Sequence, residues 1–127
     1  MKRATIISLA LILGFCLVAG AFAADKDAIQ KQVDEIVVSI DSGKKADDFK
    51  SAAQNKPNYV FIMEEGGQML VHPSLVGQSL KDKAEPVYNE CSKATTDGTW
   101  VEYEWQGKQK NTYVRKTKDG LIVGSGY

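Results

Sequence analysis

The sequence predicts an α+β domain in which helices precede and interrupt an antiparallel sheet. Apolar residues recur every three or four positions over residues 25–41, which is the spacing of a helix with one buried side. From Tyr59 onward the period changes to two, and short β-like runs are joined by turns that contain glycine. Runs joined by tight turns pair as antiparallel strands, so we expect one such sheet with its helices gathered at one side.

The first helix is predicted over DKDAIQKQVDEIVVSID, residues 25–41. Asp25 or Asp27 can cap its start, and Asp41-Ser42-Gly43 ends it. A stripe of this kind packs either on the sheet of its own domain or against another chain. The sequence therefore leaves open a homodimer through this helix. The apolar stripe consists of Ile29, Val33, Ile36, Val37 and Ile40.

A shorter helix over ADDFKSAAQ, residues 46–54, and a β-hairpin are predicted next. Pro57 ends the helical region, because a proline biases the residue before it away from helical dihedral angles. The hairpin strands are YVFIM at 59–63 and MLV at 69–71. Gly66-Gly67 between them supplies the positive φ that a tight turn needs.

A long connection and three further strands complete the predicted fold. Residues 73–98 contain a helix from about Glu85 to Lys93. The segments TWVEYEW, NTYVRKT and LIVGSGY then alternate as strands, and QGKQ and KDG form the turns between them. No internal repeat or interdomain linker interrupts the pattern, so we expect a single domain.

The first 23 residues have the pattern of a secretory signal peptide. Two basic residues near the start precede an apolar run from Ile6 to Val18, and Ala21-Phe22-Ala23 matches the small-x-small pattern of a cleavage site. The alternative is an uncleaved membrane anchor, because the apolar stretch approaches the roughly 20 residues that span a bilayer. Cleavage after Ala23 predicts one exported domain over residues 24–127, periplasmic or secreted.

Charge and cysteine content narrow the classes of function. The 16 basic and 16 acidic residues balance, so no electrostatic argument favours nucleic acid or an anionic membrane as a partner. Cleavage removes Cys16 and leaves Cys91 as the single thiol, which cannot form an internal disulfide. A buried, inert thiol is the simpler interpretation of Cys91.

The sequence contains no recognisable catalytic or cofactor motif. There is no His, Cys and Asp set at metal-ligand spacing, no phosphate-binding glycine loop and no nucleophile elbow. We therefore expect no cofactor, no metal site and no enzymatic activity. The single histidine, His72, stands at a strand end before Pro73, where a hydrogen-bonded structural role is the simpler interpretation. A small enzyme that uses His72 as a base is the alternative.

Aromatic side chains on the predicted meander suggest a binding wall. Val101, Tyr103 and Trp105 alternate with glutamates and so share one face of their strand. The next strand places Tyr113 nearby, and Lys110 on the same hairpin offers a cation for a carboxylate. Tyr and Trp suit either the edge of a core or the wall of a small-ligand pocket. Periodicity alone favours ordinary core packing, and an exposed position for the lysine.

Four segments taken together resemble the single Cache domain. They are YVFIMEEGGQMLVHPSLVGQSL at 59–80, GTWVEYEW at 98–105, KNTYV at 110–114 and GLIVGSGY at 120–127. Cache domains are extracytoplasmic sensory domains of bacterial chemoreceptors and histidine kinases. The resemblance covers essentially the whole chain after the signal peptide, including the leading helix.

The resemblance implies a PAS-like antiparallel sheet of five or six strands, with a long N-terminal helix, a helical crossover and a pocket on one sheet face. The expected ligand is a small organic molecule, either a short carboxylate or an amino acid. Relatives commonly continue into a membrane helix where this chain ends, so we expect a separate membrane-bound receptor as partner. The alternative is an interaction module that dimerises through its N-terminal helix. The positions that correspond to the pocket are Phe61, Met63, His72, Tyr103, Trp105, Lys110 and Tyr113.

Overall fold

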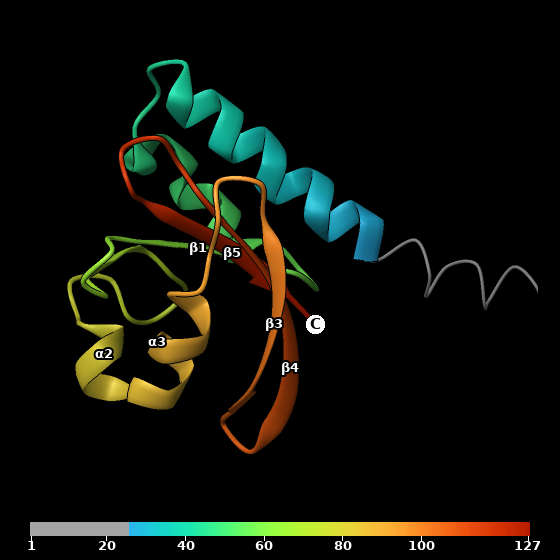
Figure 1. Ribbon diagram of the computed structural model, residues 1–127, viewed down its shortest axis with the longest axis vertical. Coiled ribbons are helices and arrows are strands. Elements are labelled where there is room, and N and C mark those ends of the chain that lie inside the picture. Colours follow the sequence, from blue (N-terminus) through green and yellow to red (C-terminus); the bar gives the residue numbers. More distant parts are fainter. Residues whose placement is uncertain (1–25) are drawn as a thin grey trace, which may run out of the picture.

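A five-stranded antiparallel sheet separates two helical layers in the computed structural model, which describes residues 26–127 (Figure 1). The strands follow one another in space in the order β2-β1-β5-β4-β3. The predicted signal peptide, residues 1–23, lies outside the described residues. The α+β architecture and the antiparallel sheet are as predicted. The strands are β1 Val60–Met63, β2 Met69–Val71, β3 Thr99–Trp105, β4 Lys108–Lys116 and β5 Ile122–Gly126.

Helices cover both faces of this sheet (Figure 1). One face carries a helix of residues 26–41, called the N-terminal helix below, and the 3-10 helix η1, Ala46–Gln54. The other face carries α2, Leu80–Lys83, and α3, Glu85–Cys91. The expectation that the helices gather at one side was wrong. Every residue of β1 is buried, and a strand that is apolar on both sides needs cover on both sides.

The apolar stripe of the N-terminal helix forms the core of the first layer. Its five residues are 0% to 6% exposed and pack with Val60, Ile62 and Val123 of the sheet. The stripe therefore has no surface left for a second chain, which contradicts the expectation that these five residues pack against another copy, whereas dimerisation through the exposed side of the helix stays a prediction. The stripe consists of Ile29, Val33, Ile36, Val37 and Ile40.

Local signals explain most of the remaining elements. The turn between β1 and β2 is closed by the Gly67 amide, which donates to the Glu64 carbonyl at 2.9 Å, and Gly67 has a φ of 100°. The predicted second helix is a 3-10 helix with a kink at Phe49. The short helix α2 was not predicted; its start is capped by Ser79, whose hydroxyl accepts from the Asp82 amide at 3.3 Å.

The register of the β3–β4 hairpin decides which side chains meet on each face. Trp105 pairs with Lys108 across a two-residue turn, so Tyr103 lies opposite Lys110. Opposite residues of an antiparallel pair project to the same face. Tyr103 and Lys110 therefore share the face that α2 and α3 cover, and their immediate neighbours along each strand face the N-terminal helix.

Candidate functional site

A small hollow lies on the sheet face that α2 and α3 cover. It is enclosed by aromatic and apolar side chains from the sheet, from both helices and from the segment after β2. Its volume is about 10 Å³, close to the minimum that holds one water molecule. The protein's own side chains thus nearly fill it in this conformation. The lining residues are Tyr59, Phe61, Met69, His72, Leu80, Val87, Cys91, Tyr103 and Trp105.

The floor of the hollow depends on strand alternation and on one glycine. Phe61 packs in the layer beneath α2 and α3, whereas Val60 and Ile62 pack against the N-terminal helix. Gly124 pairs with Phe61 across the β1–β5 ladder. A Cβ atom at Gly124 would collide with the Phe61 ring, so this glycine gives the ring its place on the sheet.

His72 is held in one tautomer by the backbone that follows it. Its Nδ1 accepts hydrogen bonds from the amides of Ser74 at 3.0 Å and Leu75 at 3.1 Å. The proton of the neutral ring must therefore be on Nε2, which makes Nε2 a donor. Burial lowers the pKa of His72 to about 4, so the ring is neutral at physiological pH.

This tautomer limits what His72 can do chemically. The Nδ1 lone pair is already used by two amides, and Nε2 carries a proton, so neither nitrogen is free to act as a base or to ligate a metal in this arrangement. No acceptor for the Nε2 proton is found among residues 26–127. The ring also packs edge-on against Tyr59, with ring centroids 5.7 Å apart, and against Trp105, at 6.2 Å.

A short polar chain crosses the floor of the hollow. Thr112 Oγ1 donates to the Tyr103 hydroxyl at 2.9 Å, and that hydroxyl also hydrogen-bonds with the Cys91 thiol. Burial raises the pKa of Tyr103, and it raises the pKa of Cys91 to about 12. Cys91 is therefore a neutral thiol at physiological pH and a poor nucleophile.

Lys110 does not line the hollow, but it places a positive charge beside Tyr59, which does. Its Nζ lies 5.3 Å from the centre of the Tyr59 ring, in the geometry of a cation–π contact. The side chain is half-buried, and burial lowers the pKa of the ammonium group. In the part of the chain that the structure describes, no carboxylate lies within ion-pair distance of it. The Lys110 ammonium group thus lies beside a lining residue of the hollow, and no described side chain neutralises its charge.

The structure brings together five of the seven residues expected at the pocket. Four line the hollow, and the Lys110 ammonium group lies over the ring of Tyr59, a fifth lining residue that was not expected. Met63 is on the same face but is fully buried in the core and does not reach the hollow. The four lining residues are Phe61, His72, Tyr103 and Trp105.

Tyr113 lies on the opposite face of the sheet, away from the hollow. It pairs with Trp100 in the β3–β4 ladder, and its ring packs in the core beneath the N-terminal helix. Its hydroxyl lies 2.9 Å from a carboxylate oxygen of Asp34 on that helix. Tyr113 therefore belongs to the contact between helix and sheet.

Five lining residues were not expected from the sequence. Tyr59 precedes Phe61 by two positions, so the alternation of the strand already placed it on the same face. The others come from β2 and the two crossover helices, and only the folded arrangement brings them to the sheet. They are Met69, Leu80, Val87 and Cys91.

Neither a metal site nor a membrane-spanning helix is found among the described residues. Over residues 26–127, no three side chains among His, Cys, Asp and Glu are grouped closely enough to hold a metal ion. In the same range, no helix combines the length and the apolar character needed to cross a bilayer.

Comparison with known proteins places the chain in a family. The family model for the Cache domain matches residues 21–127. A methyl-accepting chemotaxis protein from Vibrio parahaemolyticus has a similar structure, with a TM-score of 0.58 and 15% sequence identity, covering 84% of this chain and 89% of that chain. The ligand-binding domain of Mlp24 with asparagine aligns with a TM-score of 0.38 and 15% identity, over 54% of this chain and 27% of that chain.

No curated protein sequence matches significantly. The family match covers all of the described residues, and the chemotaxis protein shares their fold. The fold class expected from the sequence, a Cache domain with a PAS-like sheet, is thereby confirmed. The chain belongs to the Cache domain family of extracytoplasmic sensory domains that bind small molecules.

Proposed function

We propose that this domain is a periplasmic sensory module that binds a short carboxylate in the hollow beneath α2 and α3. The observation that carries the proposal is the Lys110 ammonium group, which lies over the ring of the lining residue Tyr59 and has no carboxylate partner among the described residues. A charged group in such a place is stabilised by an anionic ligand through charge-assisted hydrogen bonds.

The polar groups of the hollow favour a carboxylate over an amino acid. The Lys110 ammonium group and the His72 Nε2 proton are both donors, and they suit the oxygens of an anion. None of the nine described lining residues carries a carboxylate. The ammonium group of an amino acid would therefore lose its hydration without gaining an acidic partner, which is costly.

The apolar wall limits the rest of the ligand. Met69, Leu80 and Val87 also line the hollow, and their apolar side chains suit a short hydrocarbon tail. A volume of about 10 Å³ is too small for any organic acid, so binding requires part of the wall to move. The sheet side is held by ladders on β1 and β4, whereas α2 and α3 span only four and seven residues. We expect the helical side to move outward.

A thermal-shift experiment with matched compounds tests this function. Propionate and alanine have the same carbon skeleton and differ in the ammonium group. A ligand at a hundredfold excess over its dissociation constant stabilises the folded state by about 2.7 kcal/mol. We expect propionate or a close homologue to raise the melting temperature, and alanine to have little effect. If none of acetate, propionate, butyrate, lactate and pyruvate raises the melting temperature, the proposed ligand class is overturned.

We propose further that the domain is exported and that it acts on a membrane-bound receptor. The N-terminal pattern of a basic start, an apolar run and a small-x-small site supports export and cleavage after Ala23. Cell fractionation followed by N-terminal sequencing tests it: the expected product is periplasmic and begins at Ala24. A membrane-bound product that retains residues 1–23 would instead show an anchored domain.

A further inference from the structure

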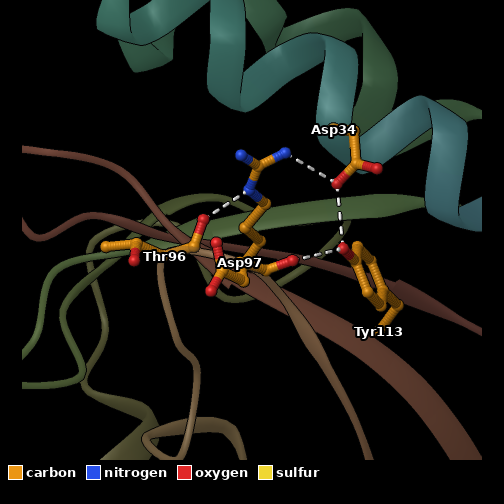
Figure 2. Close-up of polar contacts among 5 residues, drawn as sticks. Asp34, Thr96, Asp97 and Tyr113 are labelled. Atoms are coloured by element: carbon orange, nitrogen blue, oxygen red, sulfur yellow. Dashed lines mark hydrogen bonds and ion pairs between the residues drawn. The ribbon is translucent and has the colours of Figure 1, made fainter.

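A polar cluster joins the N-terminal helix to the loop between α3 and β3 (Figure 2). Asp34 Oδ1 accepts from the Tyr113 hydroxyl at 2.9 Å and from Arg115 Nη1 at 3.0 Å. Arg115 Nε donates to the Thr96 carbonyl at 2.8 Å, and the Tyr113 hydroxyl also lies 3.2 Å from the Asp97 carbonyl. Strand β4 thus holds the helix on one side and the loop on the other.

This loop, residues 92–98, connects two walls of the hollow. It begins after Cys91 at the end of α3 and leads into β3, which carries Tyr103 and Trp105. The Lys116 amide donates to the Thr95 carbonyl at 2.8 Å, so the loop is also fixed to β4. A displacement of α3 therefore pulls on a loop that is held to β4 and whose Thr96 and Asp97 carbonyls contact Arg115 and Tyr113.

The Tyr113 hydroxyl can donate its proton to either of two acceptors. It has one proton and lies within reach of two acceptors, Asp34 Oδ1 and the Asp97 carbonyl. The backbone at Gly98 lies directly against this hydroxyl, because a Cβ atom there would collide with it. Movement of the loop must therefore change the position of the ring or the acceptor of the proton.

We propose that Asp34 is the residue through which ligand binding acts on the N-terminal helix. The proposal rests on the function proposed above, in which a ligand moves α3 outward. That movement draws the Asp97 carbonyl away from Tyr113, since the 3.2 Å contact is the longer of the two. The hydroxyl then donates to Asp34 alone, and the helix is held more tightly on the sheet. Discrete alternatives of this kind are what allow one site to bias another.

A second polar contact of the same helix provides a matched control. Asp41 Oδ1 accepts from the Lys118 amide at 2.9 Å, and Lys118 lies in the turn between β4 and β5. This turn joins two sheet strands and contributes no residue to the hollow. Asp34→Ala and Asp41→Ala therefore remove the same kind of side chain from the same helix, but only the first breaks the connection to the pocket wall.

Hydrogen exchange of the helix amides tests the direction of the effect. Propionate is expected to slow exchange over residues 30–38 in the wild type and in Asp41→Ala. The protection should be lost in Asp34→Ala and in Tyr113→Phe, which removes only the hydroxyl. Equal protection in all four proteins would overturn the proposal, because a purely structural contact would not alter the response to a ligand.

A double-mutant cycle tests, without a ligand, whether Asp34 is energetically coupled to the wall of the hollow. Distant, independent substitutions change the unfolding equilibrium constant additively in free energy, to within about twofold. Cys91→Ala alters the pocket wall. When it is combined with Asp34→Ala, we expect the unfolding equilibrium constant to differ from the additive value by more than about threefold. When it is combined with Asp41→Ala, we expect the additive value. Additivity in both pairs would overturn the connection. If propionate gives no thermal shift, the proposed ligand class fails, and this cycle still tests the role of Asp34.

Discussion

His72 gives the domain a pH dependence that can be measured. Burial lowers its pKa to about 4, below the value of 6.5 expected in the unfolded chain. Between these values the unfolded chain binds a proton that the folded chain does not, so stability rises with pH across this window. The contribution of His72 is fully present above about pH 6.5 and is lost as the pH falls to about 4.

We predict that His72→Asn removes this part of the pH dependence. The asparagine oxygen can still accept from the Ser74 and Leu75 amides, but it does not titrate. From about pH 7 to about pH 4, the wild type should lose on the order of 2–3 kcal/mol more of its free energy of unfolding than the variant loses. Urea unfolding at both pH values measures the difference. Equal losses in the two proteins would contradict the assigned environment of His72.

Lys110 is the residue on which the proposed ligand class depends most directly. We predict that Lys110→Ala weakens carboxylate binding at least about tenfold, which corresponds to about 1.4 kcal/mol and is modest for a hydrogen bond to a charged group. Lys108→Ala is the control, because Lys108 lies on the same strand and is exposed. Titration calorimetry with propionate checks both variants. Unchanged affinity in Lys110→Ala would remove this lysine from the site.

At the scale of elements, the two sides of the N-terminal helix should respond differently to truncation. Ile36 is 6% exposed and packs in the core, whereas Val38 on the same helix is 56% exposed. We predict that Ile36→Ala costs 2–5 kcal/mol of unfolding free energy, to order of magnitude, and that Val38→Ala changes it by less than about 0.5 kcal/mol. Urea unfolding combined with sedimentation tests this. A large, concentration-dependent effect of Val38→Ala would show that the exposed side packs against another chain.

Elements with a strong local signal could be predicted, and those set by tertiary packing could not. The amphipathic period identified the N-terminal helix, and glycine turns identified the β1–β2 hairpin. The four-residue helix α2 has no such period, and its apolar residue, Leu80, is buried only because it meets the sheet face. The sequence did contain a signal that both faces would be covered, because the four residues of β1 are all apolar and do not alternate with polar ones.

The alternation of strand residues predicted only those members of the candidate site that lie on the strands. Tyr103 and Trp105 followed from the period of two and Phe61 from the resemblance, whereas Tyr113 was expected at the pocket and lies on the other face. Its face depends on the hairpin register, which the two-residue turn at Gln106-Gly107 sets, with φ of 51° and 80°. The four-residue turn expected over QGKQ would pair Tyr113 with Glu102, which projects to the same face as Trp100, so either turn places Tyr113 away from Tyr103 and the strand alternation was misapplied.

At the scale of the whole molecule, the sheet separates the proposed binding side from the N-terminal helix. The N-terminal helix lies on the opposite face of the sheet from α2 and α3 (Figure 1). The hollow is lined in part by α2 and α3, and every residue of β1 and β5 is buried. The largest ligand that fits is then set by how far α2 and α3 can move away from the sheet. Substitutions on the helical wall should change ligand size, and substitutions in the core of the same layer should change stability alone.

Val87 on α3 provides the test of this division. Val87→Ala removes two methyl groups from the wall, so the best straight-chain carboxylate should become longer by one or two carbons. Each added methylene that is buried contributes about 0.8 kcal/mol, or about fourfold in affinity. Val114→Ala is the control, because Val114 is fully buried in the same layer but does not line the hollow. Calorimetry with acetate, propionate, butyrate and valerate should show a changed order of affinity in Val87→Ala and the wild-type order in Val114→Ala. The same order in all three proteins would mean that α3 does not form the wall against which the ligand's tail packs.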